Sequence, residues 1–219
     1  MELVEGIRTR RSIRAYRSTP IPKEIIEKVL EAARWSPSYM NTQPWEVAVV
    51  SGKKKDELNK VLTKMAEAGV APNREWPRPK SWPPELEKRT REFSAGRLKA
   101  LGVEGEEEQR KAMRSLSLNF NGAPCVMFLF MDRELTSWSV FDMGLFAQTL
   151  ILAAHSLGLC SCLQAGILDY PHAIREFLGI PETKLLVLGI LLGYPDLKAP
   201  INSYRTGRAS LDDFVKWCI

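Results

Sequence analysis

The sequence predicts an α+β protein, a three-layer sandwich in which helices cover both faces of a sheet. Three observations lead to this class. Short runs rich in Val, Leu, Ile and Phe, at residues 45–50, 125–131 and 185–191, are typical of strands. These runs are apolar on both faces, so we expect the sheet to be covered on both sides. Helical segments lie between the runs along the whole chain rather than in a separate block.

The helices are predicted from the spacing of apolar residues. Residues 23–35 place them at the period of an amphipathic helix. Residues 140–157 read as a long buried helix that ends at Gly158, and a shorter helix at residues 172–178 ends at Gly179. The long helix approaches the length of a membrane span, but polar side chains interrupt it and no basic flank follows. We therefore expect no membrane association.

Composition indicates an ordinary globular chain. Its 219 residues, 45% of them hydrophobic, suffice for a single domain over residues 1–219. The formal net charge of +5 suits an anionic small ligand as well as nucleic acid. The four cysteines lack the spacing of a zinc site or a disulfide framework, which favours a reducing, cytoplasmic compartment. Acidic residues stand where a signal peptide needs basic ones, so export is not expected.

Two segments lack the pattern of a core element. Residues 70–115 begin rich in proline and tryptophan and continue as a charged helical run. They are interpreted as an insertion or lid, and a solvated linker with a surface helix is the alternative. Residues 195–219 have no periodicity, yet they end in apolar residues that need burial. An extended arm that returns to its own subunit, or reaches a partner, would bury them.

The segment from residue 8 to residue 17 concentrates five arginines around Ser12. Guanidinium groups and a hydroxyl together suit a phosphate. A basic, solvent-exposed turn is an equally simple interpretation. A nucleic-acid patch is a third, but it would need basic and aromatic residues interleaved elsewhere, and the chain has no recognisable nucleic-acid module.

Two further loops carry candidate ligand contacts. Residues 36–45 place hydroxyls and amides between two prolines directly before a strand, either as ligand contacts or as a turn that bonds its own backbone. Residues 160–166 pass a step of small residues, Ala165 and Gly166, which would let the backbone approach a flat ligand or simply make a tight turn. Cys160 and Cys162 are expected to be core residues.

Several kinds of active site are not signalled. The only histidines are His155 and His172, and neither stands near a cysteine or carboxylate at ligand spacing, so no metal site is predicted. The chain lacks a Ser-His-Asp signature, a GxGxxG fingerprint and a P-loop. Chemistry without such groups points to an organic cofactor.

Six segments in this order resemble the nitroreductase family of FMN-dependent oxidoreductases, and the likeness runs over nearly the whole chain. They are RRSIRAY at residues 10–16, SPSYMNTQPW at 36–45, GAP at 122–124, DMGLFAQTLILAAHSLGL at 142–159, GILLGYP at 189–195 and RTGRASLDDFVKW at 205–217. The segment between the second and third resembles the nitrobenzoate-reductase subgroup, in which this region helps to cover the flavin.

The resemblance implies a mixed, largely antiparallel sheet flanked by helices. It implies a homodimer joined through the helix at residues 140–157, with C-terminal arms at 195–219 that embrace the partner and FMN at the subunit interface. NADH or NADPH would pass a hydride to flavin N5, and a nitroaromatic or quinone-like small molecule would then take the electrons in a ping-pong reaction. The same scaffold hosts flavin-dependent dehalogenases, a flavin-fragmenting enzyme and, as a further alternative, an FMN-binding protein without turnover.

The resemblance also assigns flavin contacts within one subunit. The family contacts the phosphate and the pyrimidine edge from positions that match Arg10, Arg11, Ser12 and Arg14. Its C-terminal basic residues, which meet the phosphate, match Arg205 and Arg208. Arg14 is the residue expected to stabilise the reduced ring.

Further contacts come from three loops. The loop supplied by the other subunit corresponds to Pro37, Ser38, Asn41 and Gln43. The backbone N–H that faces flavin N5 falls at Ala165 and Gly166, next to Gln164, where many relatives have Pro and Glu. Gly166 therefore joins Arg14 as a catalytic candidate. Either Asn119 or Ser117 is expected to reach the pyrimidine ring.

Overall fold

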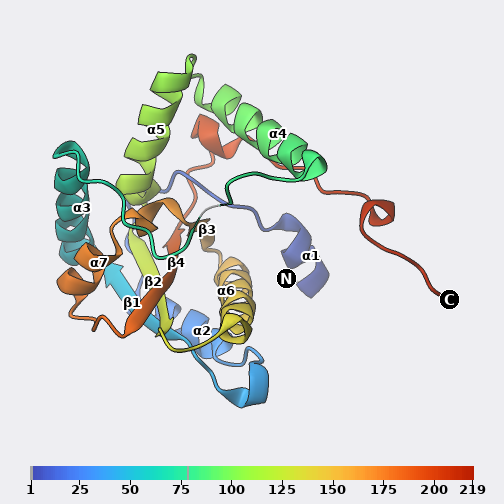
Figure 1. The fold of residues 1–219 in the computed structure, drawn as a ribbon, viewed down its shortest axis with the longest axis horizontal. Helices are drawn as coiled ribbons and strands as arrows, with labels where there is room; N and C mark the ends of the chain where they lie inside the picture. The colour runs from blue at the N-terminus through green and yellow to red at the C-terminus, as the bar shows by residue number, and fades with distance from the viewer. Residues whose placement is uncertain (1, 78) are drawn as a thin grey trace.

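The sheet is central to the fold and has four strands. The computed structural model describes residues 2–77 and 79–219. Strands β1 (Glu46–Ser51), β2 (Cys125–Asp132), β3 (Cys160–Gln164) and β4 (Lys184–Gly193) lie in the order β1-β2-β4-β3 (Figure 1). Each neighbouring pair is antiparallel. A single parallel bridge joins Ser12 to Ser161 of β3, so the sheet is largely antiparallel, as expected.

One face of the sheet is covered by α2 (Lys23–Ala33) and α6 (Ser137–Ser156). Cys125, Met127 and Leu129 of β2 point toward this side and belong to the same buried cluster as the inner faces of the two helices. Alternate residues of a strand face opposite sides of a sheet. The remaining residues of β2 therefore point to the other face, where a second layer of helices must bury them.

The opposite face is covered by α3 (Gly52–Glu67) and α7 (Pro171–Leu178). Val126, Phe128 and Phe130 of β2 pack there with Leu58 and Leu62 of α3, and all five are buried. Helices therefore cover the sheet on both sides, which confirms the predicted three-layer sandwich.

Three more helices lie outside these layers: α1 (Leu3–Thr9), α4 (Pro84–Leu101) and α5 (Glu106–Leu118). Figure 1 shows α4 and α5 rising from one end of the sheet, with α1 beside α6 and the C-terminal segment extending past α1. The charged run of residues 97–110 is not one helix, because Gly102 (φ 66°) and Gly105 (φ 84°) adopt left-handed backbone between α4 and α5.

The predicted helices are present with small shifts at their ends. The helix expected at residues 23–35 ends at Ala33. The one expected at 140–157 is α6, which begins three residues earlier, at Ser137. Gly158 (φ 79°) and Gly179 (φ 67°) follow α6 and α7 in the left-handed conformation that ends a helix. Two elements, α3 and β3, were not predicted.

Helix α6 is long and apolar enough to cross a membrane if only its length and composition are considered. Its contacts identify it as a core helix instead. Its inner face packs against the sheet, and the buried carboxylate of Asp142 accepts a hydrogen bond from the backbone N–H of Tyr39 (3.1 Å). Its outer face is open, and Trp138 and Phe141 are 63% and 64% exposed.

The segment before α4 is attached to β4 by a buried ion pair. Glu75 accepts hydrogen bonds from Arg175 Nη1 (2.8 Å) and from the Leu186 N–H (3.2 Å). The neighbouring Trp76 donates its indole N–H to the Leu186 carbonyl (3.0 Å). The Arg175 side chain is 1% exposed, so this attachment belongs to the interior of the protein.

Candidate cofactor site

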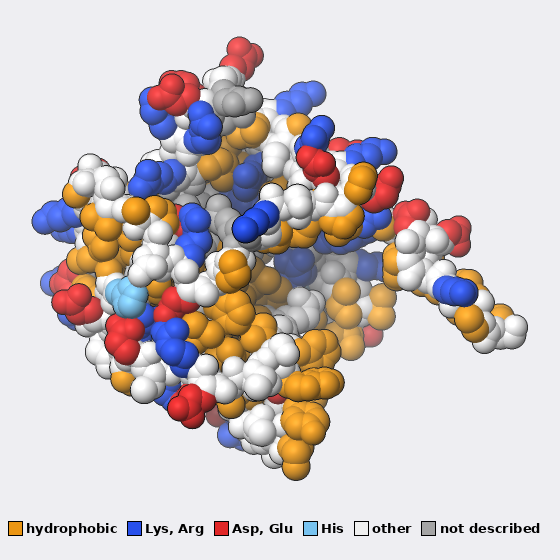
Figure 2. All heavy atoms as spheres, in the orientation of Figure 1, with side chains coloured by type: hydrophobic (Ala, Val, Ile, Leu, Met, Phe, Trp, Pro, Cys, Tyr) orange, Lys and Arg blue, Asp and Glu red, His pale blue; other side chains and the backbone are white. Residues whose placement is uncertain are grey.

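A basic cavity of about 540 Å³ lies between α1, α4 and the C-terminal arm. In Figure 2, basic side chains gather in the recess below α4. No acidic side chain is among the described residues that line this cavity. Its basic lining consists of Arg8, Arg10, Arg11, Arg14, Arg205 and Arg208.

The charges in this cavity repel one another in the absence of an anion. Burial and the positive charge of Arg208 lower the pKa of Arg10 from its ordinary value. Arg205 and Arg208 come from the opposite end of the chain, and Arg205 donates to the Arg8 carbonyl (2.6 Å). A phosphate placed here would remove the repulsion and accept several charge-assisted hydrogen bonds.

The local backbone explains why Ser12 and Arg14 face this cavity. Ile13 between them is 1% exposed, and its N–H donates to the Ser161 carbonyl of β3 (3.0 Å). Because side chains alternate along extended backbone, burial of Ile13 directs its two neighbours outward. The Arg14 N–H donates to the buried side chain of Asn202 (2.8 Å), which fixes the segment on its other side.

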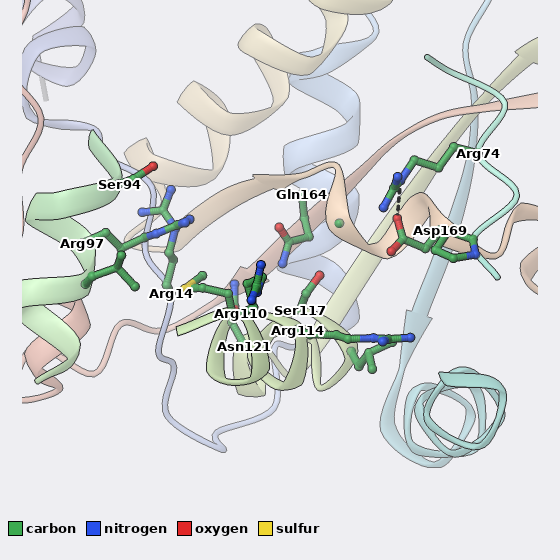
Figure 3. Close-up of a pocket in the computed structure, with 15 residues that line it drawn as sticks. Arg14, Arg74, Ser94, Arg97, Arg110, Arg114, Ser117, Asn121, Gln164 and Asp169 are labelled. Carbon is green, nitrogen blue, oxygen red and sulfur yellow. Dashed lines mark hydrogen bonds and ion pairs between the residues drawn. The ribbon is translucent and has the colours of Figure 1, made fainter. Parts of the chain in front are cut away.

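A second cavity, of about 760 Å³, adjoins the first, and Arg14 lines both. Gln164, Gly166, Ser117 and Asn121 line it as well (Figure 3). The two cavities therefore meet at the Arg14 side chain.

One wall of the larger cavity has a polar atom that the chain leaves unsatisfied. Ser117 Oγ is buried and has no hydrogen-bond partner among the described residues. A Cβ built on Gly166 would lie 2.3 Å from the same oxygen, so a larger residue at this position would require Ser117 to move. The wall therefore offers a hydroxyl to a ligand that carries a polar edge.

The structure brings most of the predicted residues of one subunit together. Gln164 and Gly166 line the larger cavity, while Ala165 is exposed between them. Of the two candidates near residue 119, Ser117 lines the larger cavity and Asn119 lines neither. The basic cavity collects Arg10, Arg11, Ser12, Arg14, Arg205 and Arg208.

The loop of residues 36–45 lies apart from these cavities, and Pro37, Ser38, Asn41 and Gln43 line neither. It is attached near the start of α6, where Asp142 accepts from the Tyr39 N–H. The arginine segment is attached near the end of α6, where His155 Nε2 and Thr9 Oγ1 are 3.0 Å apart. Thirteen residues separate Asp142 from His155 (155 − 142), which is about 20 Å along a helix.

Sequence reasoning missed several residues of the larger cavity. Asn121 is buried and lies in left-handed backbone (φ 52°), and its position before Gly122 is the signal that could have indicated it. Arg97, Arg110 and Arg114 of α4 and α5 also line this cavity. Cys162 is a core residue as expected, whereas Cys160 is only partly buried, and burial raises the pKa of both thiols.

The fold and this site define a class of protein: an α+β protein with a basic cavity whose charge suits a phosphate and a larger cavity beside it. The model of the nitroreductase family matches residues 7–194. The chain belongs to the nitroreductase family.

Its relatives cover nearly the whole chain. Nitroreductase NfnB of Mycolicibacterium smegmatis is 37% identical, over 96% of this chain and 90% of its own length. A 4-nitrobenzoate reductase of a Nocardioides species is 33% identical, over 95% of this chain and 87% of its own. The crystal structure of FMN-dependent NfnB from Mycobacterium smegmatis in complex with NADPH covers all of both chains, with a TM-score of 0.94 and 33% identity.

Proposed function

We propose that this chain is an FMN-dependent NAD(P)H oxidoreductase that reduces nitroaromatic or quinone-like acceptors and works as a homodimer. The observation that carries the proposal is that Arg14 lines both cavities, with six arginines in one and the unsatisfied Ser117 hydroxyl beside Gly166 in the other. The names of the full-length relatives, an FMN-dependent nitroreductase and a 4-nitrobenzoate reductase, support the same activity.

The residues present fit FMN. Its phosphate matches the basic cavity, where Arg10 and Arg208 repel each other and Ser12 adds a hydroxyl. Its ring matches the larger cavity, where the unsatisfied Ser117 hydroxyl can bond a polar atom of the pyrimidine edge and Gly166 lines the same wall.

When bound, FMN supplies a ring that accepts a hydride from NADH or NADPH and passes the electrons on to the acceptor. Arg14 would stabilise the negative charge of the reduced pyrimidine edge, because its position is set before the reaction. The Arg14 backbone is bonded to Asn202, and its guanidinium lies 5.5 Å from the centroid of the Phe93 ring. Gly166, which lines the larger cavity, would offer its backbone N–H to the ring.

The second half of the site is supplied by a partner subunit. A two-fold axis that pairs two α6 helices in antiparallel orientation would place the start of one helix beside the end of the other. The loop with Pro37, Ser38, Asn41 and Gln43 would then reach the partner's basic cavity, which it cannot reach within one chain. Exposed apolar side chains mark this interface on α1, α6 and the arm: Leu3, Val4, Ile7, Trp138, Phe141, Leu211, Phe214 and Trp217.

The remaining segments take roles consistent with this site. Residues 1–219 form one domain, in which residues 70–115 act as a lid over the larger cavity and residues 195–219 embrace the partner. The lid carries Arg97, Arg110 and Arg114 of that cavity. A cytoplasmic location suits the free cysteines and a nicotinamide donor.

Purification and a two-step assay test the proposed function. The protein is expected to be yellow, with flavin absorption near about 450 nm, and to oxidise NADPH or NADH steadily once a nitroarene is added. Arg14→Ala is expected to lower both FMN retention and the rate of hydride transfer. A protein that stays colourless with added FMN, or an Arg14→Ala variant unchanged in both properties, contradicts the proposal.

A further inference from the structure

The larger cavity holds more positive charge than FMN needs. Five arginines line it, at positions 14, 74, 97, 110 and 114, and Asp169 is the one carboxylate among its described lining residues. Asp169 accepts a hydrogen bond from Arg74 Nε (2.6 Å), so this pair is close to neutral (Figure 3). With Arg14 assigned to the flavin, Arg97, Arg110 and Arg114 remain, and none forms an ion pair with a described residue.

Arg97 is the most buried of these three. Its Nε is buried and has no hydrogen-bond partner among the described residues. Its guanidinium lies 4.8 Å from the centroid of the Phe93 ring, the same ring that Arg14 contacts. Burial and the charge of Arg14 lower the pKa of Arg97. A buried guanidinium N–H without an acceptor is costly, so this group needs an acceptor that the described residues do not supply, and an anion would provide one.

Arg110 and Arg114 present a second side of the same space. They are four residues apart on α5 and so lie on one face of that helix. Arg114 donates to the Tyr170 hydroxyl (3.2 Å), which in turn donates to the Val70 carbonyl (3.1 Å). These two hydrogen bonds hold the Arg114 side chain in position. Figure 3 shows Arg110 beside Asn121 and Ser117, with Arg97 across the cavity next to Arg14.

We propose that Arg97, Arg110 and Arg114 form a carboxylate subsite, and that the acceptor this enzyme selects is an aromatic acid. The inference rests on the proposed function and extends it from nitroaromatics in general to those that carry a negative charge. Guanidinium groups recognise a planar carboxylate through paired hydrogen bonds.

The position of the three arginines favours the acceptor over the 2′-phosphate of NADPH as the source of the anion. They line the same cavity as Gly166 and Ser117, which face the ring. A carboxylate on an aromatic acceptor lies one ring away from the reacting group. The 2′-phosphate lies at the far end of the dinucleotide from the nicotinamide, beyond a ribose and a pyrophosphate.

A matched pair of acceptors tests the subsite in the FMN-loaded dimer. We expect a higher kcat/KM for 4-nitrobenzoate than for its uncharged methyl ester. Arg97→Met and Arg110→Gln should each lower the ratio of the two kcat/KM values roughly ten- to hundred-fold, the usual effect of losing a charge-assisted hydrogen bond. The change should lie mainly in KM, because the subsite binds the acceptor without touching the reacting group.

Binding without turnover gives a second measurement. Benzoate, which the enzyme cannot reduce, should perturb the absorption of the oxidised flavin, and its Kd should rise in both variants. Uncharged benzamide should bind weakly to every form. Matched controls are Arg91→Gln on α4 and Lys111→Gln on α5, whose side chains form exposed ion pairs with Glu87 and Glu107. The controls should leave both measurements unchanged.

The outcomes separate the two proposals. Equal losses for the acid and the ester overturn the subsite, and so does a Kd for benzoate that neither variant changes. The variants could instead lose activity with NADPH more than with NADH, while the ratio of kcat/KM for the acid and the ester stays constant. That result would assign the arginines to the nicotinamide donor and would also overturn the carboxylate subsite. A yellow enzyme that reduces neither acceptor contradicts the proposed function, whereas the benzoate titration still tests the subsite on its own.

Discussion

The Oγ of Ser117 is buried, and no described residue provides a hydrogen-bond partner for it. A buried hydroxyl without a hydrogen bond destabilises the folded protein by about 1–3 kcal/mol. A ligand in the larger cavity, which Ser117 lines, would provide the missing partner. The effect of Ser117 on the stability of the apoprotein and its effect on FMN affinity can therefore be measured separately.

Ser117→Ala should leave the apoprotein as stable as the wild type or more stable, because it removes the unsatisfied hydroxyl. It should weaken FMN binding about two- to ten-fold, the effect of losing one neutral hydrogen bond. Thermal unfolding of the apoprotein and titration with FMN measure the two effects. A less stable apoprotein with an unchanged Kd for FMN would show that Ser117 serves only the fold.

Arg10→Gln and Arg208→Gln should weaken the binding of FMN roughly ten-fold or more, because each removes a charged donor to the phosphate. Riboflavin has no phosphate, so its Kd should change much less. Arg17→Gln is the matched control, since Arg17 belongs to the same segment and lines neither cavity. Equal effects on FMN and riboflavin would place the phosphate elsewhere.

The sequence predicts those site residues that follow one another along the chain. Residues 10–14 stand together, and the chemistry of several guanidinium groups beside a hydroxyl is visible without a fold. Arg97 and Asn121 were missed because they enter the cavity only through the placement of α4 and the turn after α5. The local sequence of Arg97 does not separate it from the other charged residues of the same helix, and the only local signal for Asn121 is its position before Gly122.

At the scale of elements, the ion pair of Glu75 holds the start of the lid segment on β4. Burial acts to raise the pKa of Glu75, but hydrogen bonds from Arg133, Arg175 and the Leu186 N–H outweigh it and leave this pKa below its ordinary value of 4.5. The folded state therefore binds fewer protons at this carboxyl than the unfolded state. The resulting stability is present above about pH 4.5 and is lost as the pH falls below it.

Glu75→Gln should lower the free energy of unfolding at neutral pH by about 3 kcal/mol, because the buried Arg175 loses the carboxylate at its Nη1 and keeps only the exposed carboxylate of Glu182 at its Nη2. The difference from the wild type should shrink as the pH falls below about 4.5, where the wild-type carboxyl takes up a proton. Urea unfolding at a series of pH values measures both effects. Arg133→Gln, at the exposed side of Glu75, should cost less, and a pH-independent difference would refute the linkage.

The elements predicted correctly are those whose own pattern of apolar residues shows which of their faces are buried. Strand β2 is apolar at nearly every position because both faces are covered, and α2 repeats its apolar residues at the helical period. Strand β3, with the sequence CSCLQ, is short and carries polar residues. It exists because its five residues pair with β4, from Cys160 opposite Gly193 to Gln164 opposite Gly189, and this long-range pairing has no local signal.

At the scale of the whole molecule, one chain leaves too much apolar surface uncovered. Phe214 and Trp217 of the arm are each 68% exposed, and Phe141 of α6 is 64% exposed. Surfaces of this kind mark an interface. The loop of residues 36–45 lies apart from the basic cavity of its own subunit and would reach that of the partner. The interface would therefore serve FMN binding as well as assembly.

Phe141→Lys should convert the dimer into a monomer that has lost FMN, because a charge would be buried at the centre of the interface without a partner. Size-exclusion chromatography with light scattering measures the mass, and absorption measures the flavin. Leu86→Lys, an exposed apolar position on α4, is the control and should remain a yellow dimer. A monomeric Phe141→Lys variant that keeps FMN would show that one subunit suffices for the site.

The buried Asn202 joins the two ends of the chain. Its side chain accepts from the Arg14 N–H and donates to the carbonyls of Ala15 and Asp196, all at 2.8 Å. The first arginine of the basic cavity is residue 8 and the last is residue 208. During synthesis, residue 208 must therefore leave the ribosome before the pocket for the flavin phosphate is complete, so the first 200 residues cannot form this pocket by themselves.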